Sequence, residues 1–454
     1  MNRNEEYLAL MQELETTPDA LETTVERALE RKNALRKKKY IFGVPAGSLA
    51  ACFAGFVLLV NCFPTFAYAC GGMPLLRELA KAVAWSPSLS AAVENEYVQP
   101  IGLSQTKEGI TATIEYLIVD QKQVNIFYTL KGDYEDLSGR TVSFSPEQHC
   151  AFSYGGSPNL PGTLQNITLD YVDEDVPEGF SVTIGMESRD LLENEAPARS
   201  VEEEMLNPGK EIAPQVIAEF TFDLKFDPGF TAVGEVIPVN CTVEVGGQRI
   251  TVTEAQIYPS HVRINVADRT DNTAWLKGLE FYLTNERGQR FEPISNGITA
   301  TGGDGTDSYA SFRLESTWFA RSRHLTLHIT GTEWLDKDRE WIRLDLVQRS
   351  ADCLPEGVEF RSAERHSGGW LLEFCALRRE EHHTHQLFHM TFEDMAGKEY
   401  SMGSQSSYTD YEDESGMYFI EQLPLPDYHE NEVWLRPTYT HTIREEMPIT
   451  IQIK

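Results

Sequence analysis

IFGVPAGSLAACFAGFVLLVNCF, residues 41–63, contains no charged side chain. As an α-helix, these 23 residues would rise about 35 Å, enough to cross a hydrocarbon core about 30 Å thick. A helix that is apolar on every side and this long is more typical of a membrane span than of the core of a soluble domain. The stretch therefore predicts a transmembrane helix, with the rest of the chain divided between two compartments.

Basic residues flank only one end of this stretch. Arg36, Lys37, Lys38 and Lys39 precede it, whereas the first charged residue after it is Arg77. Because Lys and Arg are retained in the cytoplasm, we expect residues 1–39 inside and residues 64–454 outside, in a single-pass protein of the cell membrane. A cleaved signal peptide ending before Cys70 is the alternative, although its 39-residue basic and acidic leader would be unusually long.

The formal charge lies on the part of the chain beyond the tail. Residues 1–39 hold eight basic and eight acidic side chains, so residues 40–454 carry the whole net charge of −31. This charge argues against direct binding of nucleic acid or of anionic polymers. Acidic runs at residues 170–175 and 410–414 could attract calcium weakly, but solvated loops are the commoner explanation of such runs.

Candidate chemistry is sparse. The seven cysteines are too widely spaced for a disulfide framework or a zinc site, and only a single pair, Cys353 with Cys375, stays open. The histidines at residues 382–389 give a weak indication of a metal, and the glycine-rich residues 302–307 lack the lysine that phosphate binding needs. We therefore expect no enzyme and no cofactor.

The tail predicts two short amphipathic helices, the second beginning at Thr17-Pro18. Thirty-nine residues are too few for a core of their own, so the apolar stripes must bury against a protein partner or rest on the lipid bilayer. The candidate partner-binding residues on these stripes are Tyr7, Leu10, Leu14, Leu21, Val25 and Leu29.

The segment after the span resembles a known family. NCFPTFAYA (residues 61–69) leads into MPLLRELAKAV (residues 73–83), a second short helix is predicted at 87–96, and IGLSQTKEGITATIEYLIVDQKQVNIFYTL follows at 101–130. This pattern is similar to single-pass membrane proteins of Gram-positive bacteria that are encoded beside extracytoplasmic-function sigma factors and regarded as anti-sigma factors with ectodomains of unknown function. The first histidine is His149, so the zinc motif of better understood anti-sigma factors cannot lie in the tail.

The resemblance implies a sigma factor as the partner of the tail and membrane proteases as the means of release. The residues themselves point to one region for a first cut, since small and flexible residues separate Pro64 from the next helix. The expected site comprises Ala67, Tyr68, Ala69 and Cys70, and a second cut is expected within the glycine-containing span.

Beyond residue 97 the pattern changes to alternating β-strands. Hairpins are predicted at 110–130, 250–266 and 358–376, and closing strands at 217–226, 341–347 and 448–453. This repeat predicts a mainly β protein whose three tandem domains are immunoglobulin-like sandwiches. The expected division is cytoplasmic helices 1–39, transmembrane helix 40–63, juxtamembrane helices 64–96, and β-domains 97–227, 228–352 and 353–454.

Two functions fit this organisation. The first is a membrane-anchored anti-sigma factor, which sequesters a sigma factor through its tail and senses an outside signal through its β-domains. The alternative is a cell-surface binding or adhesion protein, in which the tail only anchors the span.

Overall fold

The computed structural model describes residues 73–132, 137–145, 150–155, 162–188, 206, 216–296, 298–302, 308–377, 386–403, 405–411 and 417–454. Strands account for 62% and helices for 6%, so the predicted mainly β class is confirmed. The tail at residues 1–39 and the apolar stretch at residues 41–63 lie outside the described residues. In the part of the chain that the structure describes, no helix has the length and apolar character needed to cross a membrane.

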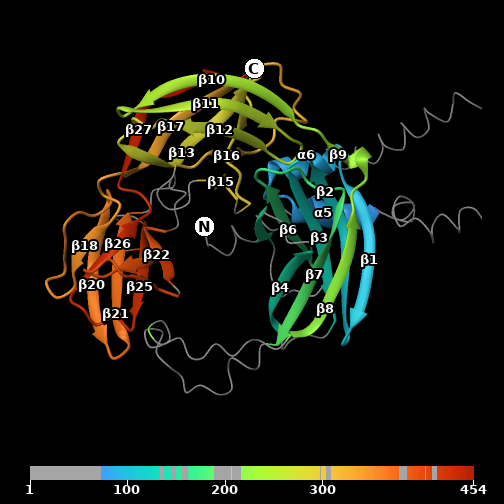
Figure 1. The fold of residues 1–454 in the computed structure, drawn as a ribbon. Helices are drawn as coiled ribbons and strands as arrows, with labels where there is room; N and C mark the ends of the chain where they lie inside the picture. Colours follow the sequence, from blue (N-terminus) through green and yellow to red (C-terminus); the bar gives the residue numbers. More distant parts are fainter. Residues whose placement is uncertain are drawn as a thin grey trace, which may run out of the picture.

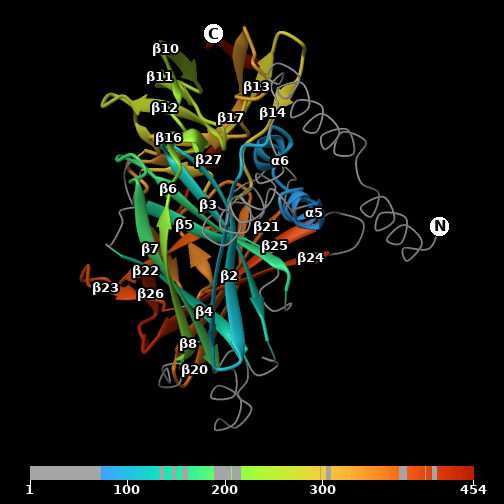
Figure 2. The same ribbon diagram turned by 90° about the vertical axis from the view of Figure 1, so that its right-hand side faces the viewer.

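Two helices precede the first strand, as the sequence predicts: α5 (Met73–Ala82) and α6 (Pro87–Glu94). α6 begins at a residue pair suited to a helix N-terminus. Ser86 Oγ accepts a hydrogen bond from the Leu89 N–H at 3.3 Å, and Pro87 occupies a first-turn position where no backbone donor is needed. Figure 2 shows both helices (blue) on the flank of the β-domain that follows them.

Domain 1 is built from two sheets that share one core. One sheet has the order β1-β2-β3-β6-β5, with the short β9 beside β2, and the other has the order β4-β7-β8. Side chains from both sheets, such as Ile126 and Phe220, fill the space between them. The strands are β1 (Gln99–Lys107), β2 (Ile110–Asp120), β3 (Gln123–Lys131), β4 (Leu137–Ser145), β5 (Cys150–Gly155), β6 (Leu164–Tyr171), β7 (Gly179–Ser188), β8 (Val216–Lys225) and β9 (Thr231–Ala232).

A bulge in β2 turns this strand into a two-sided element. The register shifts between Ile114 and Tyr116, so Leu117 points into the core between the sheets. Tyr116 and Ile118 then face the opposite way and pack against the helices. Simple alternation along the sequence therefore predicts the strand but not which side chains meet α5 and α6.

Domain 2 repeats the two-sheet plan, with the orders β10-β11-β12-β16-β15 and β14-β13-β17-β27. Its core again draws on both sheets, for example on Ile264 and Trp334. A short 3-10 helix, η1 (Pro228–Phe230), precedes it. The strands are β10 (Glu235–Val245), β11 (Gln248–Ile257), β12 (Val262–Asp268), β13 (Ala274–Asn285), β14 (Arg290–Phe291), β15 (Ala300–Thr301), β16 (Ser311–Leu314), β17 (Leu325–Asp336) and β27 (His441–Gln452).

Domain 3 has the sheet orders β19-β18-β26-β22-β23 and β20-β21-β25-β24. Phe374 and Phe392 represent the two sheets in its core. Leu206, from the segment between β7 and β8 of domain 1, packs against Leu371 on β21. The strands are β18 (Ile342–Asp345), β19 (Ser350–Ala351), β20 (Val358–His366), β21 (Gly369–Leu377), β22 (Phe388–Glu393), β23 (Glu399–Ser401), β24 (Ser406–Tyr411), β25 (Met417–Pro426) and β26 (Glu432–Pro437).

The three domains share one strand order. In domain 1 the strands from β2 to β8 pair in the order first, second, fifth, fourth in one sheet and third, sixth, seventh in the other. Domain 2 repeats this order from β11 when the short β14 is left out of the count. Domain 3 repeats it from β20 when the short β23 is left out and β18 takes the place of the seventh strand. The three predicted hairpins are the first two strands of each set: β2-β3, β11-β12 and β20-β21.

The closing strands pair differently from our expectation. We expected residues 341–347 to close domain 2 and residues 448–453 to close domain 3. In the structure, β18 pairs with β26 of domain 3, whereas β27 pairs along β17 of domain 2. Domain 3 is thus inserted between β17 and β27, and a division of the chain at residue 352 does not follow the strand pairing. A repeat in the sequence identifies a closing strand but not the domain that it closes.

Figure 1 shows the resulting arrangement as an arch. Domain 2 (yellow-green, with the red C-terminal strand) lies at the top, and domain 1 and domain 3 extend below it on opposite sides. α5 and α6 lie with domain 1, close to its contact with domain 2. The region where α6, domain 1 and domain 2 meet is the candidate functional site.

Candidate functional site

The residues predicted to bind a partner or to be cut lie outside the described residues. These are Tyr7, Leu10, Leu14, Leu21, Val25 and Leu29 in the tail, and Ala67, Tyr68, Ala69 and Cys70 after the span. The structure does describe the segment that follows them, from Met73 onward. This segment contacts two β-domains.

Apolar contacts attach the helices to domain 1. Leu79, Val83 and Leu89 are buried against the outer face of β2 and β3, where they meet Ile118 and Phe127. Burying side chains of this size stabilises such a contact by about 1.5–3 kcal/mol each. The helices are thus part of the folded domain and do not hang from it as a linker.

A carboxylate of domain 2 binds the first turn of α6. Glu315, which follows β16, accepts a hydrogen bond from the Ser88 N–H at 2.7 Å, from the Ser86 hydroxyl at 3.4 Å and from the Ser88 hydroxyl. The Ser316 N–H in turn donates to Ser88 Oγ at 2.6 Å. We call these four residues the clamp. A negative charge is well placed here, because the first backbone N–H groups of a helix lack partners within it.

The clamp is closed to water. Ser86, Ser88 and Glu315 are all buried. Burial raises the pKa of Glu315, and the hydrogen bonds from the two serines oppose this shift. Beside the clamp, the ring of Phe319 from domain 2 lies 5.9 Å from that of Tyr97, just after α6.

The main contact between domain 1 and domain 2 is a buried ionic cluster. Asp170, at the end of β6, has an oxygen 2.9 Å from the Nη2 atoms of both Arg263 and Arg313, which come from β12 and β16. All three side chains are almost fully buried. Burial alone would raise the pKa of Asp170, but the charges of Arg313 and Arg263 outweigh it and hold the pKa well below its usual range.

A chain of hydrogen bonds continues from this cluster. Arg263 Nε–H donates to His261 Nε2 at 2.9 Å, so His261 carries its proton on Nδ1, which lies 2.7 Å from Ser260 Oγ. The Ser260 hydroxyl then donates to Asp120 Oδ2 at 2.6 Å, and the Ser260 N–H donates to the same oxygen at 2.9 Å. Burial and the neighbouring Arg263 lower the pKa of His261 far below its usual value, so the imidazole is neutral.

We call the set Asp120, Asp170, Ser260, His261, Arg263 and Arg313 the joint. Asp120 also accepts the N–H groups of Lys122 and Gln123, which fixes the turn between β2 and β3. The turn of the first hairpin in domain 1 is therefore bonded to the corresponding turn in domain 2. Ser260 lies between His261 and Asp120, but its hydroxyl is fully buried and donates to the carboxylate and not to the imidazole, so it is not arranged as a nucleophile.

Tyr97, just after α6, is hydrogen-bonded to β2 and to β9. Its hydroxyl donates to the Val119 carbonyl oxygen at 2.6 Å and accepts the Ala232 N–H at 2.8 Å. Ala232 belongs to β9, which pairs in parallel with the end of β2. The chain that leaves domain 1 is thus bonded to the residue that follows the helices.

The acidic and thiol groups singled out in the sequence have other partners here. Asp170 is occupied by two arginines, and Asp175 binds Lys122 and Gln121. Within the described ranges no group of three or more His, Cys, Asp or Glu side chains could hold a metal. Cys353 and Cys375, the pair left open by their spacing, do not form a disulfide with each other.

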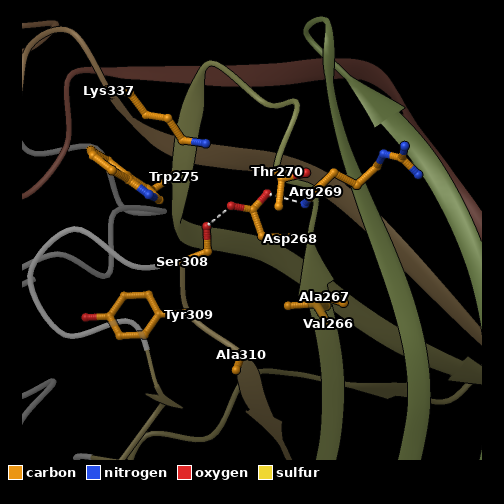
Figure 3. Close-up of a pocket in the computed structure, with 10 residues that line it drawn as sticks. All are labelled: Val266, Ala267, Asp268, Arg269, Thr270, Trp275, Ser308, Tyr309, Ala310 and Lys337. Atoms are coloured by element: carbon orange, nitrogen blue, oxygen red, sulfur yellow. Dashed lines mark hydrogen bonds between the residues drawn. The ribbon is translucent and has the colours of Figure 1, made fainter.

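An open pocket of about 410 Å³ lies in domain 2. Figure 3 shows Trp275, Tyr309 and Lys337 along one side of it, with Asp268 and Ser308 joined by a hydrogen bond in the centre. Lys337 Nζ lies 5.7 Å from the centre of the Trp275 ring and donates to the Asn272 carbonyl oxygen at 2.7 Å. The pocket combines aromatic surface with two cations, Arg269 and Lys337, and one carboxylate. Asp268 and Ser308 already bind each other, Lys337 binds the backbone and Arg269 binds Asp271.

Sequence reasoning missed both the joint and the clamp. The available signal was a charged residue inside an apolar strand, as with Arg263 in VRINV and Asp170 in LQNITLDY. In isolated strands such residues look solvent-facing, because the second domain that covers them is not visible in the sequence.

Comparison with known proteins gives limited matches. No curated protein matches the chain. A solved structure, described as that of the conserved domain protein from Bacillus anthracis, is similar with 11% identity over 59% of this chain and 82% of that chain, at a TM-score of 0.37. Nothing about function follows from a likeness at this level.

Two family models match separate parts of the chain. A domain of unknown function (DUF4179) matches residues 36–132, from the end of the tail through the apolar stretch and both helices to β3. A family of unknown function (DUF5643) matches residues 234–355, which contain domain 2 without β27, together with β18 and β19 of domain 3. The clamp therefore joins one matched region to the other.

Proposed function

We propose that this chain is a membrane-anchored regulator of the anti-sigma type. In this proposal residues 1–39 are cytoplasmic and sequester a sigma factor, residues 41–63 cross the membrane, and the β-domains sense a signal outside the cell. The shared strand order supports interpretation of the domains as immunoglobulin-like sandwiches, because the same order occurs in immunoglobulin constant domains.

The observation that carries the proposal is the position of the first family match. It runs without interruption from residue 36, through the predicted span and the two helices, to residue 132. DUF4179 is often found in proteins described as anti-sigma factor-like. This one match includes the end of the tail, the predicted span and the first outer strands. It therefore supports a function that involves both sides of the membrane, whereas a tail that only anchors the protein would not need to be matched together with the outer strands.

The test is direct. Leu21, Val25 and Leu29 are replaced by Asp in the full chain, which places three charges on the apolar stripe of the tail. Burial of unpaired charge is costly, so the sigma factor should be released and sigma-dependent transcription should rise. A reporter gene and co-purification of a sigma factor with the full chain provide the measurements. Unchanged transcription with normal membrane insertion contradicts the proposal.

Orientation is tested separately. Single cysteines placed near residues 20 and 300, in a chain without native cysteines, are labelled with an impermeant reagent in intact cells. We expect labelling at residue 300 only, because the basic cluster Arg36–Lys39 retains the tail inside. Labelling at residue 20 alone would reverse the assignment and remove the basis of the proposal.

Surface binding or adhesion is the second candidate. The pocket at Trp275, Tyr309 and Lys337 favours it, since an open aromatic depression on an outer domain can receive a ligand. In that case the tail substitutions would leave transcription unchanged, whereas Trp275→Ala would reduce attachment to the bound surface.

A further inference from the structure

The two attachments of α6 differ in kind. Domain 1 holds the helices by apolar packing against β2 and β3, and domain 2 adds Phe319 at the edge of this packing. Domain 2 also binds the first turn of α6, through the hydrogen bonds of Glu315 and Ser316 to the serines at its start. One helix is therefore shared between two domains that the joint also connects.

The polar attachment has a short range. The hydrogen bonds of Glu315 come from neutral donors, namely one backbone N–H and two hydroxyls, and among the described residues no ion pair of Glu315 reinforces them. A displacement of domain 2 by a few ångströms would replace these bonds by bonds to water, because a hydrogen bond does not persist over such an increase in the donor–acceptor distance. The apolar packing of the helices on domain 1 would remain, but the first turn of α6 would no longer be hydrogen-bonded to domain 2.

The joint and the clamp lie on one element. Arg313, which binds Asp170 of domain 1, is two residues from Glu315, which binds α6. β16 and the residue after it therefore contact domain 1 and the helix at the same time. Any motion of domain 2 that breaks the ion pairs of Arg313 also moves Glu315.

We propose that Glu315 is a latch, through which the position of domain 2 controls how firmly α5 and α6 are held on domain 1. When domain 2 is seated at the joint, the first turn of α6 is bound and the helices are fixed. When domain 2 is displaced, the latch opens and the helices become free to detach. The regulatory role of the latch rests on the proposed function, because in that proposal the signal outside the cell must reach the segment that follows the predicted span.

The experiment uses the full chain in lipid nanodiscs and hydrogen–deuterium exchange of the α6 amides. Glu315→Gln keeps the size of the side chain but removes its charge and one acceptor. Glu286→Gln is the matched control, since Glu286 accepts the N–H groups of Arg323 and His324 within domain 2 and does not contact the helices. Loss of bonds to a charged group predicts exchange in α6 that is about 10- to 100-fold faster for Glu315→Gln, and unchanged for Glu286→Gln.

A second variant separates a latch from a local cap. Asp170→Asn loosens the joint and does not touch α6. The latch predicts faster exchange in α6 as well as in β12 and β16, together with faster trypsin cleavage after Lys81 at the end of α5. Should this variant fail to fold, Asp120→Asn, which weakens the bonds from Ser260, replaces it.

The outcomes are distinct. Faster exchange in β12 and β16 with unchanged exchange in α6 overturns the latch, since the helices would then stay fixed without domain 2. Faster exchange in all three segments supports it. None of these measurements involves a sigma factor, so a failed transcription test would overturn the proposed function and leave the latch standing.

Discussion

Two buried carboxylates, Asp170 at the joint and Glu421 in domain 3, have opposite surroundings. Both are fully buried. Asp170 lies between two guanidinium groups at 2.9 Å, whereas Glu421 accepts hydrogen bonds from neutral donors, the Leu387 N–H and Gln405 Nε2. Burial raises the pKa of Glu421 to about 7, while the arginines hold that of Asp170 far below its usual range. One group is a fixed charge at neutral pH and the other titrates there.

This difference has a structural consequence. The charge of Asp170 changes only in strong acid, so its ion pairs with the two arginines persist across neutral pH. A carboxylate among neutral donors makes its own domain sensitive to pH near neutrality. The arch therefore combines an ionic cluster that keeps its charge with a third domain that contains a titrating carboxylate.

The largest expected effect is that of Asp170→Asn. The substitution leaves Arg263 and Arg313 buried without a counter-charge, and removal of one partner from a buried pair costs about 3–5 kcal/mol. We expect this loss in the contact between domain 1 and domain 2. Hydrogen exchange of β6, β12 and β16 measures it, since the chain has several domains and a single unfolding transition is not assured.

Asp271→Asn is the matched control, because Asp271 also binds two arginines, Arg249 and Arg269, but at the surface. It should have little effect, as exposed ion pairs are screened by water. Adding Arg313→Met to Asp170→Asn should recover part of the loss by removing one unpaired charge. Equal effects of Asp170→Asn and Asp271→Asn would contradict the importance given to burial.

The sequence was a good guide to elements and a poor guide to contacts between domains. Alternation and turn residues predicted the three hairpins because each depends on local chemistry, such as Asp120 at one turn and Gly368-Gly369 at another. The exchange of closing strands was not predictable, because β18 and β27 pair with strands about a hundred residues away in the sequence, and such pairing leaves no local signal in either strand. The joint was not predicted from the sequence for the same reason, because Arg263 and Arg313 contact Asp170 only after two domains have folded.

The next effect concerns pH and Glu421. Because its pKa in the folded state is about 7, the folded domain holds a proton that the unfolded chain, with a pKa near 4.3, releases. The free energy of unfolding therefore falls as pH rises from about 4.3 to 7 and levels off above that. The total is roughly 3 kcal/mol. Hydrogen exchange of β21 and β25 at pH 5 and pH 8, corrected for the intrinsic rates, measures it.

Glu421→Gln should remove this pH dependence, since a glutamine does not titrate and still offers one acceptor to Leu387 or Gln405. Glu430→Gln, at an exposed position of the same domain, should retain it. Asp170 adds nothing in this pH range: its lowered pKa gives stability that is present above about pH 4 and is lost only as pH falls through the folded-state value. A slope between pH 5 and pH 8 that survives in Glu421→Gln would assign the titration to another group.

The smallest effect expected is that of Ser260→Ala, which tests whether the joint depends on neutral hydrogen bonds as well as on charge. The hydroxyl donates to Asp120 and accepts from His261, both fully buried, so its removal leaves an imidazole N–H without its acceptor. Leaving a buried polar group unsatisfied costs about 1–3 kcal/mol. Asp120 keeps the Ser260 backbone N–H, so the contact between the domains should weaken and not open. Ser308→Ala is the control, since Ser308 donates to the exposed Asp268 at the pocket. If Ser260→Ala accelerates exchange in β12 as much as Asp170→Asn does, the charged cluster is not the dominant part of the joint, and the contrast with Glu421 loses its basis.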